Sequence, residues 1–230
     1  MYEKEIANWQ QTLPNNLPVA FTAYDASKGQ TDRVSSYVLD HSSLQGLIDS
    51  APEKLRLHLG LASGADFTSI PSTPYTQFYL EGLNPSSGSA VTVQMNWEPD
   101  PPFLKSGFTG PDSGVDEIPS EGALLFVMGW LETAYQDIST AFDGLNMVTN
   151  QVQRVRYYTY SADESGRIIE LLKSNTNSKL YLYLGKTIPV TAHPMGFRPV
   201  LEVRIEDSSM AGGGGGSHFF DFANPCPPAC

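Results

Sequence analysis

Two short stretches of this chain match each other, and the match limits the folds that the chain can adopt. Residues 53–60 read EKLRLHLG and residues 178–185 read SKLYLYLG, so one Lys, three Leu and one Gly recur in register. Both stretches alternate leucine with a polar or amphipathic residue, which is the period of a β-strand with one buried face. We therefore expect two equivalent strands, each ended by its glycine.

The sequence around each strand repeats in the same order. A short extended run containing Tyr37 or Tyr158 comes first, and a helical pattern follows it. After the matched strand, each copy has a proline-rich loop and another alternating strand, which begin at Pro71 and Pro194. Five elements in one order predict an internal duplication. The alternative is that two unrelated stretches share a common hydrophobic pattern.

These elements predict an α+β fold of two similar units, each a small antiparallel or mixed sheet with helices on one face. A flexible C-terminal tail follows the second unit. The predicted boundaries are 1–97 for the first unit, 98–120 for a linker rich in Pro, Gly and acidic residues, 121–207 for the second unit, 208–217 for a glycine-rich spacer and 218–230 for an aromatic and cysteine tail. The pattern leaves open whether the two units share one sheet.

The longest predicted helix covers residues 121–145. Apolar residues recur there at steps of four and three, at Leu124, Met128, Leu131, Tyr135, Ile138, Phe142 and Leu145. This spacing predicts one continuous helix with its apolar face in the core, and an oligomer seam is the alternative. The N-terminal segment around Trp9 is predicted to be a shorter counterpart in the first unit.

Composition and charge exclude some classes of partner. The chain has 14 Lys and Arg against 25 Asp and Glu, a net charge of −11, and such a surface repels the phosphates of nucleic acids. The most apolar run, residues 122–130, is about half the length that crosses a bilayer, so we expect no membrane span. The charged N-terminus differs from a secretory signal, which predicts a cytoplasmic location.

No familiar catalytic motif occurs in the sequence, and no cofactor is expected. The glycine run at 212–216 lacks the Lys and Ser/Thr of a phosphate-binding loop, so it is interpreted as a flexible spacer. An enzyme remains an alternative. Its site would form between the two units from His41, His58, Asp66 and Tyr183.

The C-terminal tail holds the residues that most favour a binding role. Phe219, Phe220 and Phe222 follow the spacer, and the cost of leaving these rings in water predicts that they dock on a surface. That surface belongs either to the same domain, where the tail would add a last strand, or to another subunit or protein.

The only two cysteines, Cys226 and Cys230, also lie in the tail. We expect no metal and no obligatory disulfide there. A disulfide or crosslink is one alternative, and a metal site of His218, Asp221, Cys226 and Cys230 is another.

The leading functional hypothesis is a non-catalytic interaction or assembly protein, whose tail reaches a protein partner or forms a homo-oligomer. Removal of residues 212–230 would then abolish binding and leave a folded core. A carbohydrate- or peptide-binding module is a further alternative, in which exposed tyrosines form a stacking surface, above all Tyr181 and Tyr183, together with Tyr157 and Tyr158.

The second half of the chain resembles a family of small uncharacterised bacterial proteins. The resemblance lies in Tyr158, residues 168–172, residues 180–185 and the PCPPAC sequence at 225–230. The resemblance implies an α+β unit that ends in a glycine-rich stretch and a Pro/Cys tail of PCPPxC type. It implies no activity, because none is known for that family. It covers residues 130–230 better than 1–97, and the second unit in one chain is a departure from the family.

Overall fold

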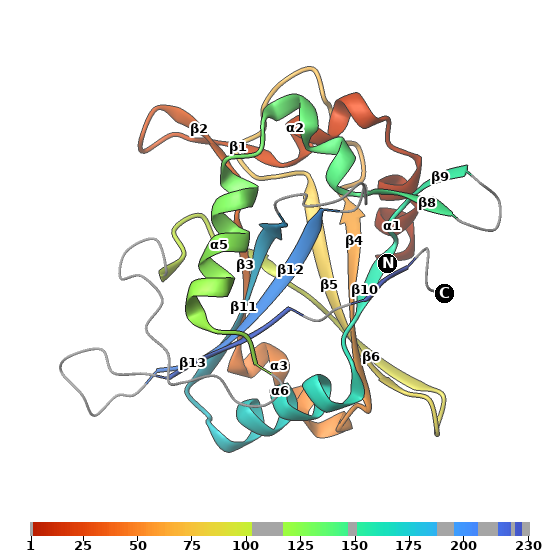
Figure 1. Cartoon of the computed structure of the whole chain (residues 1–230), viewed down its shortest axis with the longest axis vertical. Coiled ribbons are helices and arrows are strands. Elements are labelled where there is room, and N and C mark those ends of the chain that lie inside the picture. Colours follow the sequence, from red (N-terminus) through yellow and green to blue (C-terminus); the bar gives the residue numbers. More distant parts are fainter. Residues whose placement is uncertain are drawn as a thin grey trace.

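The computed structural model of the protein describes residues 2–102, 117–146, 151–187, 196–206, 216–221 and 224–226. In these residues the strands form two five-stranded sheets and two two-stranded ribbons, and the strand pairs are antiparallel (Figure 1). Helices accompany the sheets, so the predicted α+β class is confirmed. Most of the predicted linker and glycine-rich spacer falls outside the described residues.

Each large sheet contains strands from both halves of the chain. One sheet, here the β4 sheet, has the order β14 (Asn224–Cys226), β10 (Tyr157–Thr159), β4 (Lys54–Leu61), β5 (Thr76–Asn84) and β6 (Ser89–Gln94). The other, here the β11 sheet, has the order β13 (Ser217–Phe220), β12 (Phe197–Ile205), β11 (Ser178–Lys186), β3 (Ser36–Asp40) and β7 (Asn96–Trp97). Strands β3 and β10 are thus exchanged between the halves, which the sequence pattern did not predict.

The helices and ribbons surround these sheets. α1 contacts β4 and α5 contacts β11, on opposite sides of the molecule, while α3 and α6 contact each other below (Figure 1). The helical bounds are α1 (Tyr2–Gln11), η1 (Pro14–Asn16), α2 (Leu17–Ala20), α3 (His41–Ser50), α5 (Ser120–Leu131), η2 (Tyr135–Asp137), η3 (Ser139–Ala141) and α6 (Ala162–Ser174). The ribbons are β1 (Thr22–Asp25) with β2 (Gln30–Arg33), and β8 (Asp143–Asn146) with β9 (Gln151–Arg154).

The leucines of the matched strands lie in one core between the sheets, as the alternation predicts. All six are buried: Leu55, Leu57, Leu59, Leu180, Leu182 and Leu184. The glycines do not end these strands, because β4 continues to Leu61 and β11 to Lys186. Gly60 and Gly185 instead allow close helix packing: an added Cβ would lie 3.1 Å from Cβ of Glu5 in α1 or 2.9 Å from Cβ of Phe126 in α5.

Trp9 in α1 and Trp130 in α5 make the same contact with opposite halves of the chain. Trp9 Nε1 donates to the carbonyl of Val155 at 2.7 Å, and Trp130 Nε1 donates to the carbonyl of Val34 at 2.8 Å. Both indoles are fully buried. Satisfying the indole N–H fixes the depth at which each helix sits on its sheet, because an unpaired buried donor is costly.

The predicted helix over 121–145 is wrong beyond Leu131. η2 and η3 follow α5, and strand β8 begins at Asp143. Arg33, far away in sequence, donates to the carbonyls of Trp130 at 3.0 Å and Thr133 at 2.5 Å. The guanidinium therefore satisfies carbonyls that a longer helix would have bonded internally, and the chain turns at this point.

Candidate functional site

The described part of the aromatic tail is an edge strand of its own chain. In β13, Phe220 pairs with Leu201 and Phe219 with Glu202, both in β12. Phe220 is 0% exposed and belongs to the core between the sheets, whereas Phe219 is 2% exposed and belongs to a second apolar cluster that includes Ala123 and Val127 of α5. Phe222 lies outside the described residues.

The tail then crosses to the other sheet. Cys226 in β14 pairs with Tyr157 in β10, so β13 and β14 lie at the edges of two different sheets. Cys226 is buried and disulfide-bonded, contrary to the expectation of no obligatory disulfide in the tail. The other cysteine of the sequence, Cys230, lies outside the described residues. A disulfide sulfur is not a thiolate, so Cys226 does not offer the ligand that the metal alternative requires.

The remaining residues of the metal alternative have other surroundings. His218 Nδ1 lies 2.9 Å from Oε2 of Glu117, whose Oε1 accepts from Arg167 Nε at 3.3 Å. Asp221 is buried, which raises the pKa of its carboxyl group. Among the described residues, no three His, Cys, Asp or Glu side chains are grouped as a metal site requires.

Tyr181 and Tyr183 are buried, at 3% and 0% exposed, so neither ring offers a free face to a carbohydrate in this conformation. Their rings are parallel, 6.0 Å apart. Tyr183 Oη donates to Oε2 of Glu202 at 2.5 Å, and Arg204 Nε donates to Oε1 at 3.0 Å. Both oxygens of the fully buried carboxylate are thereby satisfied, as a buried charge requires.

The β4 sheet has a similar pair on its outer face. His58 Nε2 and Glu81 Oε2 are 2.8 Å apart, both side chains are buried, and Arg56 Nη1 approaches the same oxygen at 3.4 Å. The bond to His58, and then the charges of His58 and Arg56, lower the pKa of Glu81. Because Tyr183 and Glu202 form the matching pair on the β11 sheet, we interpret the His58–Glu81 pair as structural.

This pair makes a testable contribution to stability. Since the pKa of Glu81 is lower in the folded protein than its ordinary 4.5, its stabilising effect is present above about pH 4.5 and is lost as pH falls through the folded pKa. We expect the free energy of unfolding, measured in urea between pH 7 and pH 3, to fall less steeply for Glu81→Gln than for the wild type. Parallel curves would contradict this assignment.

The residues of the enzyme alternative do not converge. His41 Nδ1 lies 3.3 Å from Ser178 Oγ, but that hydroxyl donates to a backbone carbonyl of the preceding loop at 2.7 Å. Its proton is therefore not directed at the imidazole, as a nucleophile and base pair requires. His58 and Tyr183 lie on the outer faces of different sheets, and Asp66 lies in the loop after β4, where it accepts from Thr68.

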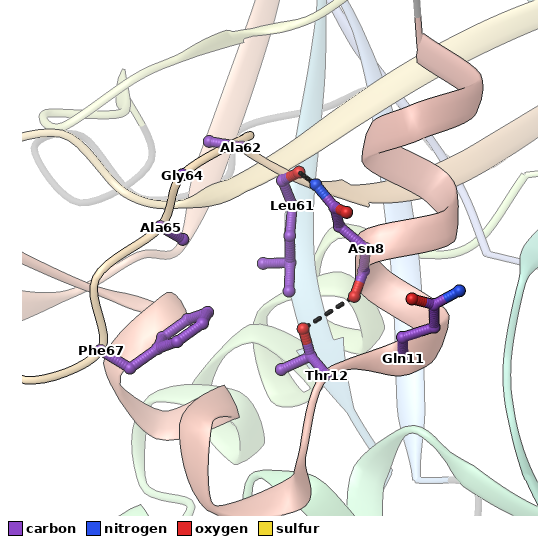
Figure 2. A pocket seen from close by; sticks show the side chains of 8 residues that line it. All are labelled: Asn8, Gln11, Thr12, Leu61, Ala62, Gly64, Ala65 and Phe67. Carbon is purple, nitrogen blue, oxygen red and sulfur yellow. Dashed lines mark hydrogen bonds between the residues drawn. The ribbon is translucent and has the colours of Figure 1, made fainter.

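Two of the hollows among the described residues are large enough to consider as sites. The first, about 260 Å³, lies between α1 and the loop after β4, and Figure 2 shows its uncharged lining of Asn8, Gln11, Thr12, Leu61, Ala62, Gly64, Ala65 and Phe67. The second, about 440 Å³, is lined by Asp40, His41, Ser42, Thr176, Asn177, Ser178, Lys179 and Glu206. In it, Lys179 Nζ lies 3.0 Å from Glu206 and 4.0 Å from Asp40. Neither hollow presents an activated nucleophile.

Among the described residues, the outer side of α5 is a surface that the packing of the fold does not explain. The helix buries Ala123, Val127 and Trp130, and it exposes Leu124, Leu125 and Met128 by 38, 64 and 40%. We call these three exposed residues the α5 face. An apolar residue on a surface is ordinary, but three adjoining ones on one helix are characteristic of interaction sites.

Two of the three equivalent positions on α1 are charged. When Trp9 is matched to Trp130, Leu124 corresponds to Glu3 and Leu125 to Lys4, both of which are exposed, whereas Met128 corresponds to Ala7. A helix in this position therefore does not need leucines on its outer side. The spacing of apolar residues over 121–145 did not predict the α5 face, because it placed Leu124 and Met128 in the core. The signal in the sequence was a surface helix that is apolar on all sides.

Comparisons with known proteins identify no relative. No family model matches the chain, no curated protein matches it, and no solved structure matches it. No helix in the described part of the chain is long and apolar enough to cross a membrane. The cytoplasmic location stays a prediction.

Proposed function

We propose that this chain is a non-catalytic binding protein and that its partner docks on the α5 face. The observation that carries the proposal is the contrast between two helices in matching positions. α1 exposes Glu3 and Lys4, whereas α5 exposes Leu124 and Leu125. Leaving these leucines in water has no benefit for the fold of a monomer, and their burial against a partner would be favourable by roughly 25 cal/mol per Å².

The contacts of the buried ionisable groups support a binding role over catalysis. Glu81, Glu202 and Glu117 each accept from a side chain of another element, namely His58, Tyr183 and Arg167. The bonds of Glu81 and Glu202 join neighbouring strands. The bond of Glu117 joins the segment before α5 to helix α6. Carboxylates used in this way stabilise the architecture and are not directed into either hollow.

We also infer that the two halves of the chain derive from a duplication. The same series of helix, ribbon, strand, helix and four strands occurs in residues 2–97 and 120–226. Matching contacts support the inference: as Arg33 holds the end of α5, Arg154 donates to the carbonyl of Thr12 after α1, at 2.5 Å in both cases. On this reading, the α5 face is a feature in which the copies diverged.

The tail is a second candidate for partner binding, but its described part is used within the chain. Phe219 and Phe220 are buried by β12, α5 and the central core. The tail would have to leave these contacts before it could bind elsewhere. The α5 face is exposed without any rearrangement, so it is the better supported site.

The proposal is tested by Leu125→Ser. We expect it to weaken partner binding by about 10- to 100-fold, which is the effect of removing an apolar anchor worth about 1–3 kcal/mol. The measurement is affinity capture from an extract of the source cells, followed by titration of the purified partner. Leu13→Ser is a matched control, because Leu13 is 67% exposed and Leu125 64%.

A partner that binds the wild type and Leu13→Ser but not Leu125→Ser, also after purification, would support the proposal. Equal binding by both variants would overturn it. Circular dichroism and thermal unfolding of each variant would establish that the fold is retained, as expected for exposed positions.

A further inference from the structure

We propose that the partner of the α5 face is a protein segment with apolar residues flanked by Lys or Arg, that is, a cationic amphipathic helix. This inference rests on the proposed function of the α5 face and identifies the chemistry of its ligand. It follows from the charges at the two ends of the face and from the position of one of them on the helix.

Acidic side chains stand at both ends of the α5 face. Glu121 and Glu132 are exposed, and their positions fall on the same side of the helix as Leu124, Leu125 and Met128. Residues spaced by three, four, seven and eleven positions lie along one side of an α-helix. At 1.5 Å per residue, the two carboxylates are about 16 Å apart along the axis, with the three apolar side chains between them.

Glu132 stands where a helix favours the opposite charge. It is the C-terminal cap of α5, and the last turn of α5 contains no basic residue. An anion at a helix C-terminus is unfavourable by roughly 0.3–1 kcal/mol, whereas a cation there is stabilising. A partner's Lys or Arg beside Glu132 would therefore interact favourably with both the carboxylate and the helix end.

Two cations of the described residues, Arg33 and Lys186, lie under α5. Arg33 is directed at the carbonyls of Trp130 and Thr133, and its guanidinium lies 5.7 Å from the centre of the Trp130 ring. The backbone carbonyl of Lys186 lies close to Gly129, on the sheet side of α5, and the side chain of Lys186 lies close to Gly196. These contacts hold both residues on the sheet side of the helix, so the outer side keeps its acidic ends.

The charge pattern favours a cationic protein over the other occupants of an apolar face. A second copy of this chain in an antiparallel helix pair would place Glu121 opposite Glu132, and a parallel pair would place each glutamate opposite itself. Each copy also carries a net charge of −11. Like charges in contact oppose association, and the same repulsion applies to an anionic membrane surface.

The inference is tested with two synthetic helical peptides that share one apolar face and differ in their flanking residues, Lys in one and Glu in the other. Fluorescence anisotropy would measure binding to the full chain in 50 and 300 mM salt. We expect the Lys peptide to bind at least about 10-fold more tightly, a preference that salt reduces because exposed charges are screened. Leu13→Ser should bind it as the wild type does.

A charge-reversed protein sharpens the test. In the double variant Glu121→Lys and Glu132→Lys, we expect the preference to reverse in favour of the Glu peptide. Leu125→Ser should weaken both peptides. Because Glu132→Lys places a cation at the helix end, thermal unfolding of the free double variant should be unchanged or higher, which separates a loss of binding from a loss of fold.

The outcomes distinguish the two proposals. If both peptides bind equally and Leu125→Ser weakens both, the α5 face is a docking site but its partner is not cationic, and this inference fails alone. If Leu125→Ser leaves Lys-peptide binding unchanged, both proposals fail. The inference is also overturned if neither peptide binds, or if sedimentation velocity shows a dimer that Leu125→Ser dissociates.

Discussion

The variant Phe142→Ala is expected to lower the free energy of unfolding by about 3–5 kcal/mol, the usual cost of truncating a fully buried aromatic side chain. Phe142 is 0% exposed and stacks on Phe21 with ring centres 5.0 Å apart and planes at 6°. Trp9 and Trp130 make T-shaped contacts with it, with ring centres 5.0 and 5.9 Å away, and the ring centre of Phe197 lies at 4.5 Å. One ring thus joins aromatic residues from both halves of the chain.

Urea unfolding of the purified variant measures this loss. The control is Tyr135→Ala, seven residues away and 47% exposed, for which we expect a change of less than about 1 kcal/mol. Domains of this kind are stable by about 5–15 kcal/mol, so Phe142→Ala should remain folded at low temperature. A loss as small as that of Tyr135→Ala would mean that the two halves do not share this core.

Removal of residues 216–230 should also destabilise the protein strongly. Phe219 and Phe220 are buried, and burial of each contributes about 1.5–3 kcal/mol, so we expect a loss of about 3–6 kcal/mol. The edges of β12 and β10 would lose their neighbours as well. The sequence predicted a folded core after removal of residues 212–230, and we now expect that core to be less stable than in the full chain.

Thermal unfolding of the truncated chain, compared with one full-length double variant, tests this result. Phe219→Ala and Phe220→Ala combined should reproduce most of the loss, since they remove the packing and keep the strand. If the truncated chain unfolds at the wild-type temperature, the tail does not contribute to the stability of the fold.

Much of the local structure was predictable, because strands and helices with one buried face leave a period in the sequence. The alternation of Leu55, Leu57 and Leu59 correctly predicted both the strand and its buried face. The helix over α6 was equally clear, and its start has the capping box of Ser161 and Glu164 that such a pattern favours. These features depend on neighbours in sequence.

The candidate site was less predictable, because exposure depends on which side of a helix meets a sheet. The seven-residue pattern from Leu124 to Leu145 assigned Leu124 and Met128 to the core, but the bonds made by Trp130 and Arg33 set the opposite orientation. Val34, which accepts from Trp130, and Arg33 are both about a hundred residues away from α5 along the chain. No local pattern contains that information.

The class of fold, the places of the matched strands and the faces that they bury follow from the amino-acid pattern, since each depends on alternation over a few residues. The exchange of β3 and β10 between the sheets, the burial of Phe219 and Phe220 by their own chain and the exposure of Leu125 depend on long-range packing. One cause is common to all three. Burial of apolar surface is not directional, so remote packing and hydrogen-bond partners select among surfaces that the sequence leaves equivalent.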